Sequence, residues 1–271
     1  MWQKLKVKML LVSLLLLVIC MKIEDNVATC TNNENTYKHI ITVYLAGDST
    51  VSDYSSSLAP RAGWGQVLNR FFDEKIVVKN EASSGRSSKS FIDEGRLKSI
   101  LDQIEKDDYL FIQFGHNDEK KEDPTRYTEP FSTYKSYLKQ YIDGARAKQA
   151  IPVLVTPVER RRFSEKGGAR DTHGEYPAAM KELGMEENVP VIDLTAKSKA
   201  LFQELGPERT KDVFFWLDAG ENKNYPNGVH DNTHFQEAGA EKTASLVLEG
   251  IEESMLVPLL NHILKYERKI K

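Results

Sequence analysis

Short apolar runs alternate with longer helix-like segments along most of this chain. Five runs rich in β-branched and aromatic residues predict strands: Ile40–Leu45, Ile76–Lys79, Tyr109–Phe114, Ile151–Val155 and Val189–Ile192. The remaining segments predict helices at Gly65–Phe72, Arg96–Glu105, Phe131–Lys148, Tyr176–Leu183, Thr195–Leu205 and Gln236 to about Ile251, with more helix over Glu252–Lys269. This alternation predicts an α/β domain with a five-stranded, mostly parallel sheet that is covered on both faces.

The N-terminus carries the pattern of a signal peptide. Three lysines precede a nearly unbroken apolar run, Met9–Cys20, which is short for a membrane span and suited to a signal-peptide core. We predict a signal peptide over residues 1–28, with cleavage after Ala28 or, alternatively, after Cys20. A flexible, polar lead-in is predicted over residues 29–38. The protein is therefore expected to be secreted or periplasmic, and a retained membrane anchor is the alternative.

Length, charge and cysteine content limit the possible classes of protein. The chain has 271 residues and no Pro-, Gly- or Ser-rich linker in its main part, so we predict one domain over residues 39–271. The formal net charge is −3, which gives no reason to expect nucleic-acid binding. The two cysteines, Cys20 and Cys30, lie near the N-terminus, so the main part has neither a disulfide framework nor a cysteine-rich zinc site. No metal or organic cofactor is expected.

Polar residues follow the first three predicted strands. The first strand ends in Gly47-Asp48-Ser49, the second runs into Asn80–Ser87, and the third runs into Gly115-His116-Asn117-Asp118. In a parallel sheet these strand ends meet at one edge, where α/β folds place their ligands. Near the C-terminus, Asp231-Asn232-Thr233-His234 puts a carboxylate and an imidazole within reach of each other across a turn.

Together these residues supply the groups that acyl transfer needs. A serine hydroxyl is a weak nucleophile that requires a base, and the base requires an acceptor on its other ring nitrogen. Ser49 is the candidate nucleophile, His234 the base and Asp231 the orienting acid. The oxyanion of the tetrahedral intermediate needs donors that are already aimed at it. The backbone N–H groups of Ser49 and Gly85 and the side-chain amide of Asn117 are the candidates.

Each of these residues also has a structural interpretation. Ser49 and Asp231 can be helix caps, Gly85 a turn glycine, and Asn117 a cap of the next helix. Asp48 and Asn80 are expected to brace the serine turn, and His116 to be a structural histidine.

The motifs resemble the four ordered blocks of the SGNH (GDSL-like) hydrolases, from about Ile40 to Leu248. Several longer stretches resemble one branch, the bacterial rhamnogalacturonan acetylesterases: Gly47-Asp48-Ser49-Thr50, Gly63-Trp64-Gly65, Asn80-x-Ala82-x-x-Gly85-Arg86-Ser87, Gly115-His116-Asn117-Asp118 and Asp231-Asn232-Thr233-His234-Phe235. The resemblance implies a three-layer α/β/α, flavodoxin-like fold. It also implies a secreted serine esterase that removes acetyl groups from acetylated plant cell-wall polysaccharide, with rhamnogalacturonan as the first choice. The alternatives are an acetylesterase on another glycan such as xylan, a broad short-chain carboxylesterase, and a non-catalytic carbohydrate-binding module.

Candidate substrate-binding residues follow the fourth predicted strand. Arg160, Arg161 and Arg162 lie at the same edge of the predicted sheet. A planar guanidinium group suits a galacturonate carboxylate, although a solvated charge run is the alternative. His173 is a further candidate for substrate contact. The aromatic run Phe214-Phe215-Trp216 is interpreted as core in preference to a sugar-stacking surface.

Overall fold

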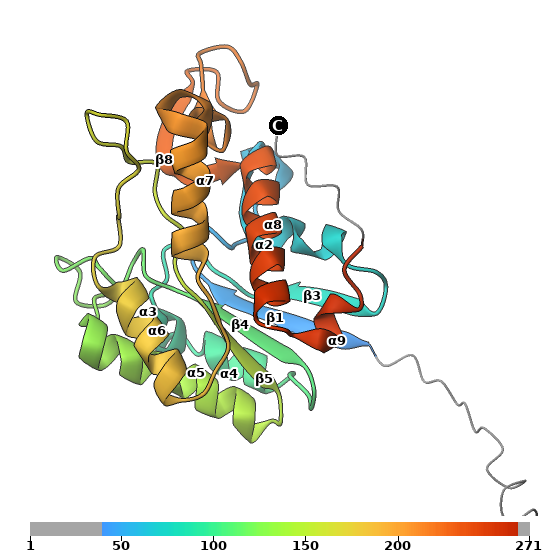
Figure 1. The fold of residues 1–271 in the computed structure, drawn as a ribbon. Coiled ribbons are helices and arrows are strands. Elements are labelled where there is room, and N and C mark those ends of the chain that lie inside the picture. Colours follow the sequence, from blue (N-terminus) through green and yellow to red (C-terminus); the bar gives the residue numbers. More distant parts are fainter. Residues whose placement is uncertain (1–39, 265–271) are drawn as a thin grey trace, which may run out of the picture. The chain divides into compact units, whose positions relative to one another are not determined.

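The computed structural model describes residues 40–264. A parallel sheet of five strands forms its centre, with helices packed around it (Figure 1). Its strand order is β3-β1-β4-β5-β6, and all neighbouring strands run parallel. The five predicted strands are confirmed, with small changes at their ends: β1 Ile41–Gly47, β3 Ile76–Asn80, β4 Tyr109–Gln113, β5 Ile151–Val155 and β6 Val191–Ile192.

Helices cover both faces of this sheet because successive side chains of each central strand point in opposite directions. Val43 and Leu45 of β1 belong to one apolar cluster, which α2, α7 and α8 complete. Tyr44 and Ala46 belong to the other cluster, which is completed by α3 to α6. The predicted three-layer α/β/α arrangement is therefore confirmed (Figure 1). The helices are α2 Trp64–Leu68, α3 Ser88–Asp93, α4 Arg96–Leu101, α5 Lys135–Ala147, α6 Tyr176–Glu186, α7 Leu194–Arg209, α8 Glu237–Glu253 and α9 Val257–Leu260.

Within the described residues, the helix predicted over Glu252–Lys269 is confirmed only in part, at the end of α8 and in α9. The chain leaves α8 at Glu253, and Met255 has a φ of 50°, a left-handed conformation that ends a right-handed helix. From there to residue 264, the only further helix is the short α9. The signal peptide (1–28) and the lead-in (29–38) lie outside the described residues and stay predictions.

A second, smaller sheet was not predicted. It has the antiparallel order β2-β8-β7, with β2 at Arg61–Ala62, β7 at Phe214–Leu217 and β8 at Val229–Gln236. Of the two longer strands of this sheet, only β7 has an apolar sequence that could have predicted it. Its Phe214 and Phe215 are buried, as expected. The sequence of β8, VHDNTHFQ, is mostly polar. It becomes a strand because it pairs with β7 on one side and β2 on the other.

Between residues 40 and 264, no helix is long and apolar enough to cross a membrane.

The contact between α8 and the chain before β7 leaves no room for a side chain at Gly239. A Cβ atom there would lie 1.8 Å from the backbone oxygen of Val213. We expect Gly239→Ala to lower the free energy of unfolding by about 2 kcal/mol or more, because backbone atoms must move to relieve the overlap. Gly250→Ala, in the same helix, is the matched control. Its Cβ would lie 2.3 Å from Ile192 Cγ2, so the overlap is with a side chain and not with backbone. Urea unfolding measures both, and an equal loss would contradict the backbone explanation.

Candidate active site

The predicted nucleophile, base and acid come together across the two sheets. Ser49 follows β1 of the parallel sheet, whereas Asp231 and His234 lie on β8 of the small sheet. His234 Nε2 lies 2.9 Å from Ser49 Oγ, and His234 Nδ1 lies 2.6 Å from Asp231 Oδ2. Ser49 is 8 % exposed. This hydrogen-bond chain is the arrangement by which a histidine can accept a serine proton while a carboxylate orients the ring.

Asp231 is held in one orientation by its own strand. Its Oδ1 accepts the backbone N–H groups of Thr233 and His234, at 2.7 and 3.0 Å. Burial alone would raise the pKa of Asp231, but the hydrogen bonds and the charge interaction with His234 bring that pKa well below its usual range. The carboxylate therefore stays ionised and accepts from Nδ1–H, which leaves Nε2 of the ring to accept the Ser49 proton. The possible role of Asp231 as a helix cap is wrong, because the residue lies inside β8.

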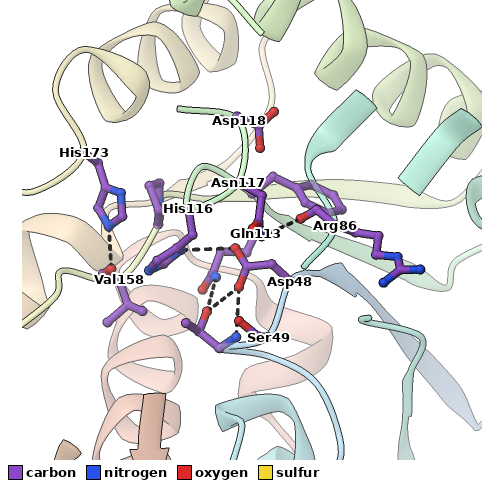
Figure 2. Close-up of polar contacts among 12 residues, drawn as sticks. Asp48, Ser49, Arg86, Gln113, His116, Asn117, Asp118, Val158 and His173 are labelled. Carbon is purple, nitrogen blue, oxygen red and sulfur yellow. Dashed lines mark hydrogen bonds and ion pairs between the residues drawn. The ribbon is translucent and has the colours of Figure 1, made fainter. Parts of the chain in front are cut away.

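The strand order explains why the predicted oxyanion donors lie on either side of Ser49. Strands β3 and β4 are the two neighbours of β1, and Gly85 and Asn117 follow their carboxyl ends. Gly85 has a φ of 81°, a conformation that favours glycine. The Asn117 Nδ2 group donates to the backbone oxygen of Arg86 at 3.0 Å (Figure 2). This bond uses one of the two Nδ2 hydrogens, so the other can be offered to a ligand.

Arg126 contacts both candidate oxyanion donors, and the sequence analysis missed it. Its Nη1 lies 3.4 Å from the backbone oxygen of Gly85 and 3.4 Å from Asn117 Oδ1. The second contact fixes the orientation of the Asn117 amide. Oδ1 faces Arg126, and Nδ2 faces away from it, toward the backbone oxygen of Arg86. Arg126 lies in an irregular loop outside every motif, so no spacing or pattern in the sequence points to it.

The serine turn is braced from beneath, as predicted for Asp48 and Asn80. The fully buried Asp48 carboxylate accepts the backbone N–H and the hydroxyl of Thr50, at 2.9 and 2.8 Å. Gln113 Nε2 in turn donates to Thr50 Oγ1, and Trp64 Nε1 donates to Gln113 Oε1, each at 2.8 Å. Asn80 Nδ2 donates to the backbone oxygen of Val51 at 2.8 Å.

Two of the three candidate substrate-binding arginines are engaged within the protein. Arg160 forms an ion pair with Glu119 and donates to the backbone oxygen of Thr172 at 3.1 Å. Arg161 lies over the Trp216 ring, 4.5 Å from its centroid, and donates to Asn232 Oδ1 at 3.1 Å. These contacts support structural roles for both.

Arg162, in contrast, is exposed. It therefore remains the best placed of the three arginines to meet a ligand.

The structure does not support substrate contact by His173. The residue is 1 % exposed. Its Nε2 lies 2.8 Å from the backbone oxygen of Val158, and its Nδ1 lies 3.2 Å from Glu119. Both ring nitrogens are thus engaged inside the protein, and the ring has no free surface for a substrate.

Among residues 40–264, no three His, Cys, Asp or Glu side chains are placed to hold a metal ion.

The chain has a flavodoxin-like strand order, and its Ser49–His234–Asp231 hydrogen bonds form the arrangement that a serine nucleophile would require. It belongs to the GDSL-like lipase/acylhydrolase family, whose model matches residues 45–242, and is accordingly a carboxylic ester hydrolase.

Individual relatives narrow the comparison. Over 232 residues, the chain is 52 % identical to rhamnogalacturonan acetylesterase RhgT of Bacillus subtilis, covering 86 % of this chain and 98 % of the relative. It is 49 % identical to the probable rhamnogalacturonan acetylesterase YesY of the same organism, covering 82 % and 97 % of the two chains. The crystal structure of protein YxiM from Bacillus subtilis superposes with a TM-score of 0.69 at 31 % identity. That match covers 80 % of this chain and 58 % of YxiM.

The buried histidine His116 makes folding stability depend on pH. Burial lowers the pKa of His116 to about 4, although Asp48 opposes this. The unfolded chain therefore takes up this proton at higher pH than the folded chain does. The stabilisation that comes from burying the neutral ring is present above about pH 6.5. It is lost as the pH falls toward 4, and the total loss in the free energy of unfolding is up to about 3 kcal/mol. We expect the free energy of unfolding to fall less steeply between pH 7 and 4.5 in His116→Asn than in the wild type. Urea unfolding across that range tests this, and parallel curves would contradict it.

Proposed function

We propose that this chain is an exported esterase that removes O-acetyl groups from pectic polysaccharide, most directly rhamnogalacturonan, through an acetyl-Ser49 intermediate. The observation that carries the reaction type is the hydrogen-bond chain from Ser49 through His234 to Asp231. Identity of 52 % to RhgT across nearly the whole of that relative supports the substrate. The basic and apolar pattern of residues 1–28 supports export, to the medium or the periplasm, with a retained anchor as the alternative.

In the first half-reaction, Ser49 Oγ attacks the acetyl carbonyl carbon and its proton passes to His234 Nε2. Asp231 stabilises the imidazolium that forms. The carbonyl oxygen gains negative charge, which the N–H groups of Ser49 and Gly85 and the amide of Asn117 stabilise. When the tetrahedral intermediate collapses, the bond to the sugar oxygen breaks. His234 donates its new proton to that oxygen, which leaves as a hydroxyl, and the acetyl group stays on Ser49.

In the second half-reaction, water replaces the sugar. His234 accepts a proton from the attacking water, the same donors stabilise the second oxyanion, and collapse releases acetate and restores the Ser49 hydroxyl. Every proton transfer passes through one nitrogen, which agrees with the placement of His234 Nε2 next to Ser49 Oγ. The assembled chain of hydrogen bonds speaks against a non-catalytic carbohydrate-binding module.

Acetate release from a panel of acetylated rhamnogalacturonan, homogalacturonan and xylan tests the substrate. The proposal expects the highest specificity constant on rhamnogalacturonan. A preference for xylan would favour an acetylesterase on another glycan. Equal rates on every substrate and on small esters would favour a broad short-chain carboxylesterase.

Substitution of the predicted catalytic residues tests the mechanism. Ser49→Ala and His234→Ala should lose nearly all activity on a chromogenic acetyl ester, and Asn117→Ala about a hundredfold or more in turnover, as for one oxyanion donor. Asp231→Asn should also lose much activity, because the ring loses its orienting acceptor. Initial rates are measured beside circular dichroism, which checks the fold. A folded Ser49→Ala variant with wild-type activity would end the assignment of the nucleophile.

Substitutions of Arg161 and Arg162 should have different effects. Arg162→Gln should lower the specificity constant for acetylated pectin several-fold, because an exposed ion pair contributes at most about 1 kcal/mol, and should leave a small neutral ester nearly unchanged. Arg161→Gln should instead lower thermal stability and act on both substrates alike, because Arg161 contacts Asn232, between the predicted acid and base. Rates on both substrates and melting temperatures distinguish them. An Arg162→Gln variant that is unchanged on pectin would remove this residue from the substrate site.

A further inference from the structure

A second Asp–His pair lies buried beneath the candidate active site. His116 Nδ1 lies 3.1 Å from Asp48 Oδ2 (Figure 2). The two residues are 3 % and 0 % exposed. No substrate can reach either side chain, so the pair cannot take part in the chemistry directly. It nevertheless occupies a particular place in the chain, because Asp48 directly precedes Ser49 and His116 directly precedes Asn117.

This placement makes the Asp48–His116 hydrogen bond a direct side-chain link between the nucleophile turn and the oxyanion loop. Asp48 also holds the turn on the nucleophile side through both donors of Thr50. On the side of His116 away from Asn117, the chain packs closely against Pro157. Gly115 has a φ of 151°, and a Cβ there would lie 2.8 Å from Pro157 Cγ. The bond thus joins the two segments next to Ser49 and Asn117, in addition to the Gln113–Thr50 contact below them.

The surroundings of the His116 ring favour one hydrogen-bonding role. Its Nδ1 can donate to the Asp48 carboxylate, whereas its Nε2 is buried and has no hydrogen-bond partner among residues 40–264. The His173 ring packs edge-on against it, with centroids 4.4 Å apart, and Arg160 Nη2 reaches the His116 backbone oxygen at 3.5 Å. The charged and titratable groups around the ring are Asp48, His173, Arg160 and Glu119. Only the Nδ1 side therefore makes a specific polar contact.

We propose that His116 is a positioning residue which, through Asp48, sets the distance and orientation between the Ser49 hydroxyl and the Asn117 amide. The inference rests on the proposed function of Ser49 and Asn117. An oxyanion donor works only when it already faces the place where negative charge develops. A displacement of about 1 Å can cost about a hundredfold in rate. Loss of the bond would also leave the Asp48 carboxylate buried with one donor fewer, so the turn itself would shift.

Two substitutions separate the hydrogen bond from the volume of the ring. The amide of Asn can occupy the position of Nδ1, whereas the amide of Gln reaches the position of Nε2. We expect His116→Gln to lower kcat on an acetyl ester between about tenfold and a hundredfold, with KM within about twofold. His116→Asn should stay within about threefold of the wild type in kcat, because it restores the donor to Asp48. Equal losses in both variants would overturn the proposal.

A double-mutant cycle with Asn117 supplies the readout that a merely structural role would not change. If His116 acts by placing the Asn117 amide, His116→Gln should cost little further in kcat once Asn117→Ala has removed that amide. Two losses that multiply would mean that His116 acts independently of Asn117, and the proposal would fail. Asp48→Asn weakens the same bond from the other side and should show the same dependence on Asn117. It serves as the second route if His116→Gln does not fold.

The same measurements keep this inference apart from the proposed function. A wild-type enzyme that hydrolyses acetyl esters and loses activity in Ser49→Ala, but not in His116→Gln, would overturn only the positioning role. A wild-type enzyme without activity on any acetyl ester would contradict the proposed function itself.

Discussion

The buried carboxylate of Asp48 is the group on which the geometry of the site depends. A carboxylate in a protein interior is costly unless donors surround it. Here the donors are the backbone and hydroxyl groups of Thr50 and the ring of His116. Thr50 also accepts a hydrogen bond from Gln113, so the hydrogen-bond network around Asp48 continues from the serine turn to β4. The requirement to satisfy one charge therefore ties together the first and third predicted strands at the edge where Ser49 lies.

The second constraint is that the predicted catalytic residues belong to different sheets. Ser49 stands at the end of a parallel strand, while Asp231 and His234 stand on the antiparallel strand β8. The distance between Ser49 Oγ and His234 Nε2 therefore depends on how the small sheet is held against the large one. Arg161 contributes by linking the chain after β5 to Asn232. Tight backbone packing at Gly239, at the start of α8, contributes close to the end of β8.

Most arginine side chains near the site make ion pairs or hydrogen bonds with other groups of the protein. Arg160 is committed to Glu119, and Arg126 contacts the backbone of Gly85 and the amide of Asn117. A run of three arginines after a strand therefore does not by itself describe a binding surface for an anionic polysaccharide. Support for a pectic substrate comes chiefly from the relatives, with Arg162 as the one exposed member of the run.

The sequence alone determined the parallel sheet and the candidate catalytic residues, because both leave local signals. Apolar runs such as Ile151–Val155 predict buried strands, and the candidate chemistry lies directly after such runs or in short motifs like Asp231-Asn232-Thr233-His234. Only the tertiary structure showed that β8 is a strand, since its polar sequence forms one through pairing with β7 and β2. Only the tertiary structure, likewise, showed which groups Arg126, His173 and His116 contact. Their roles come from contacts between segments distant in sequence, and no local pattern of apolar and polar residues records such contacts.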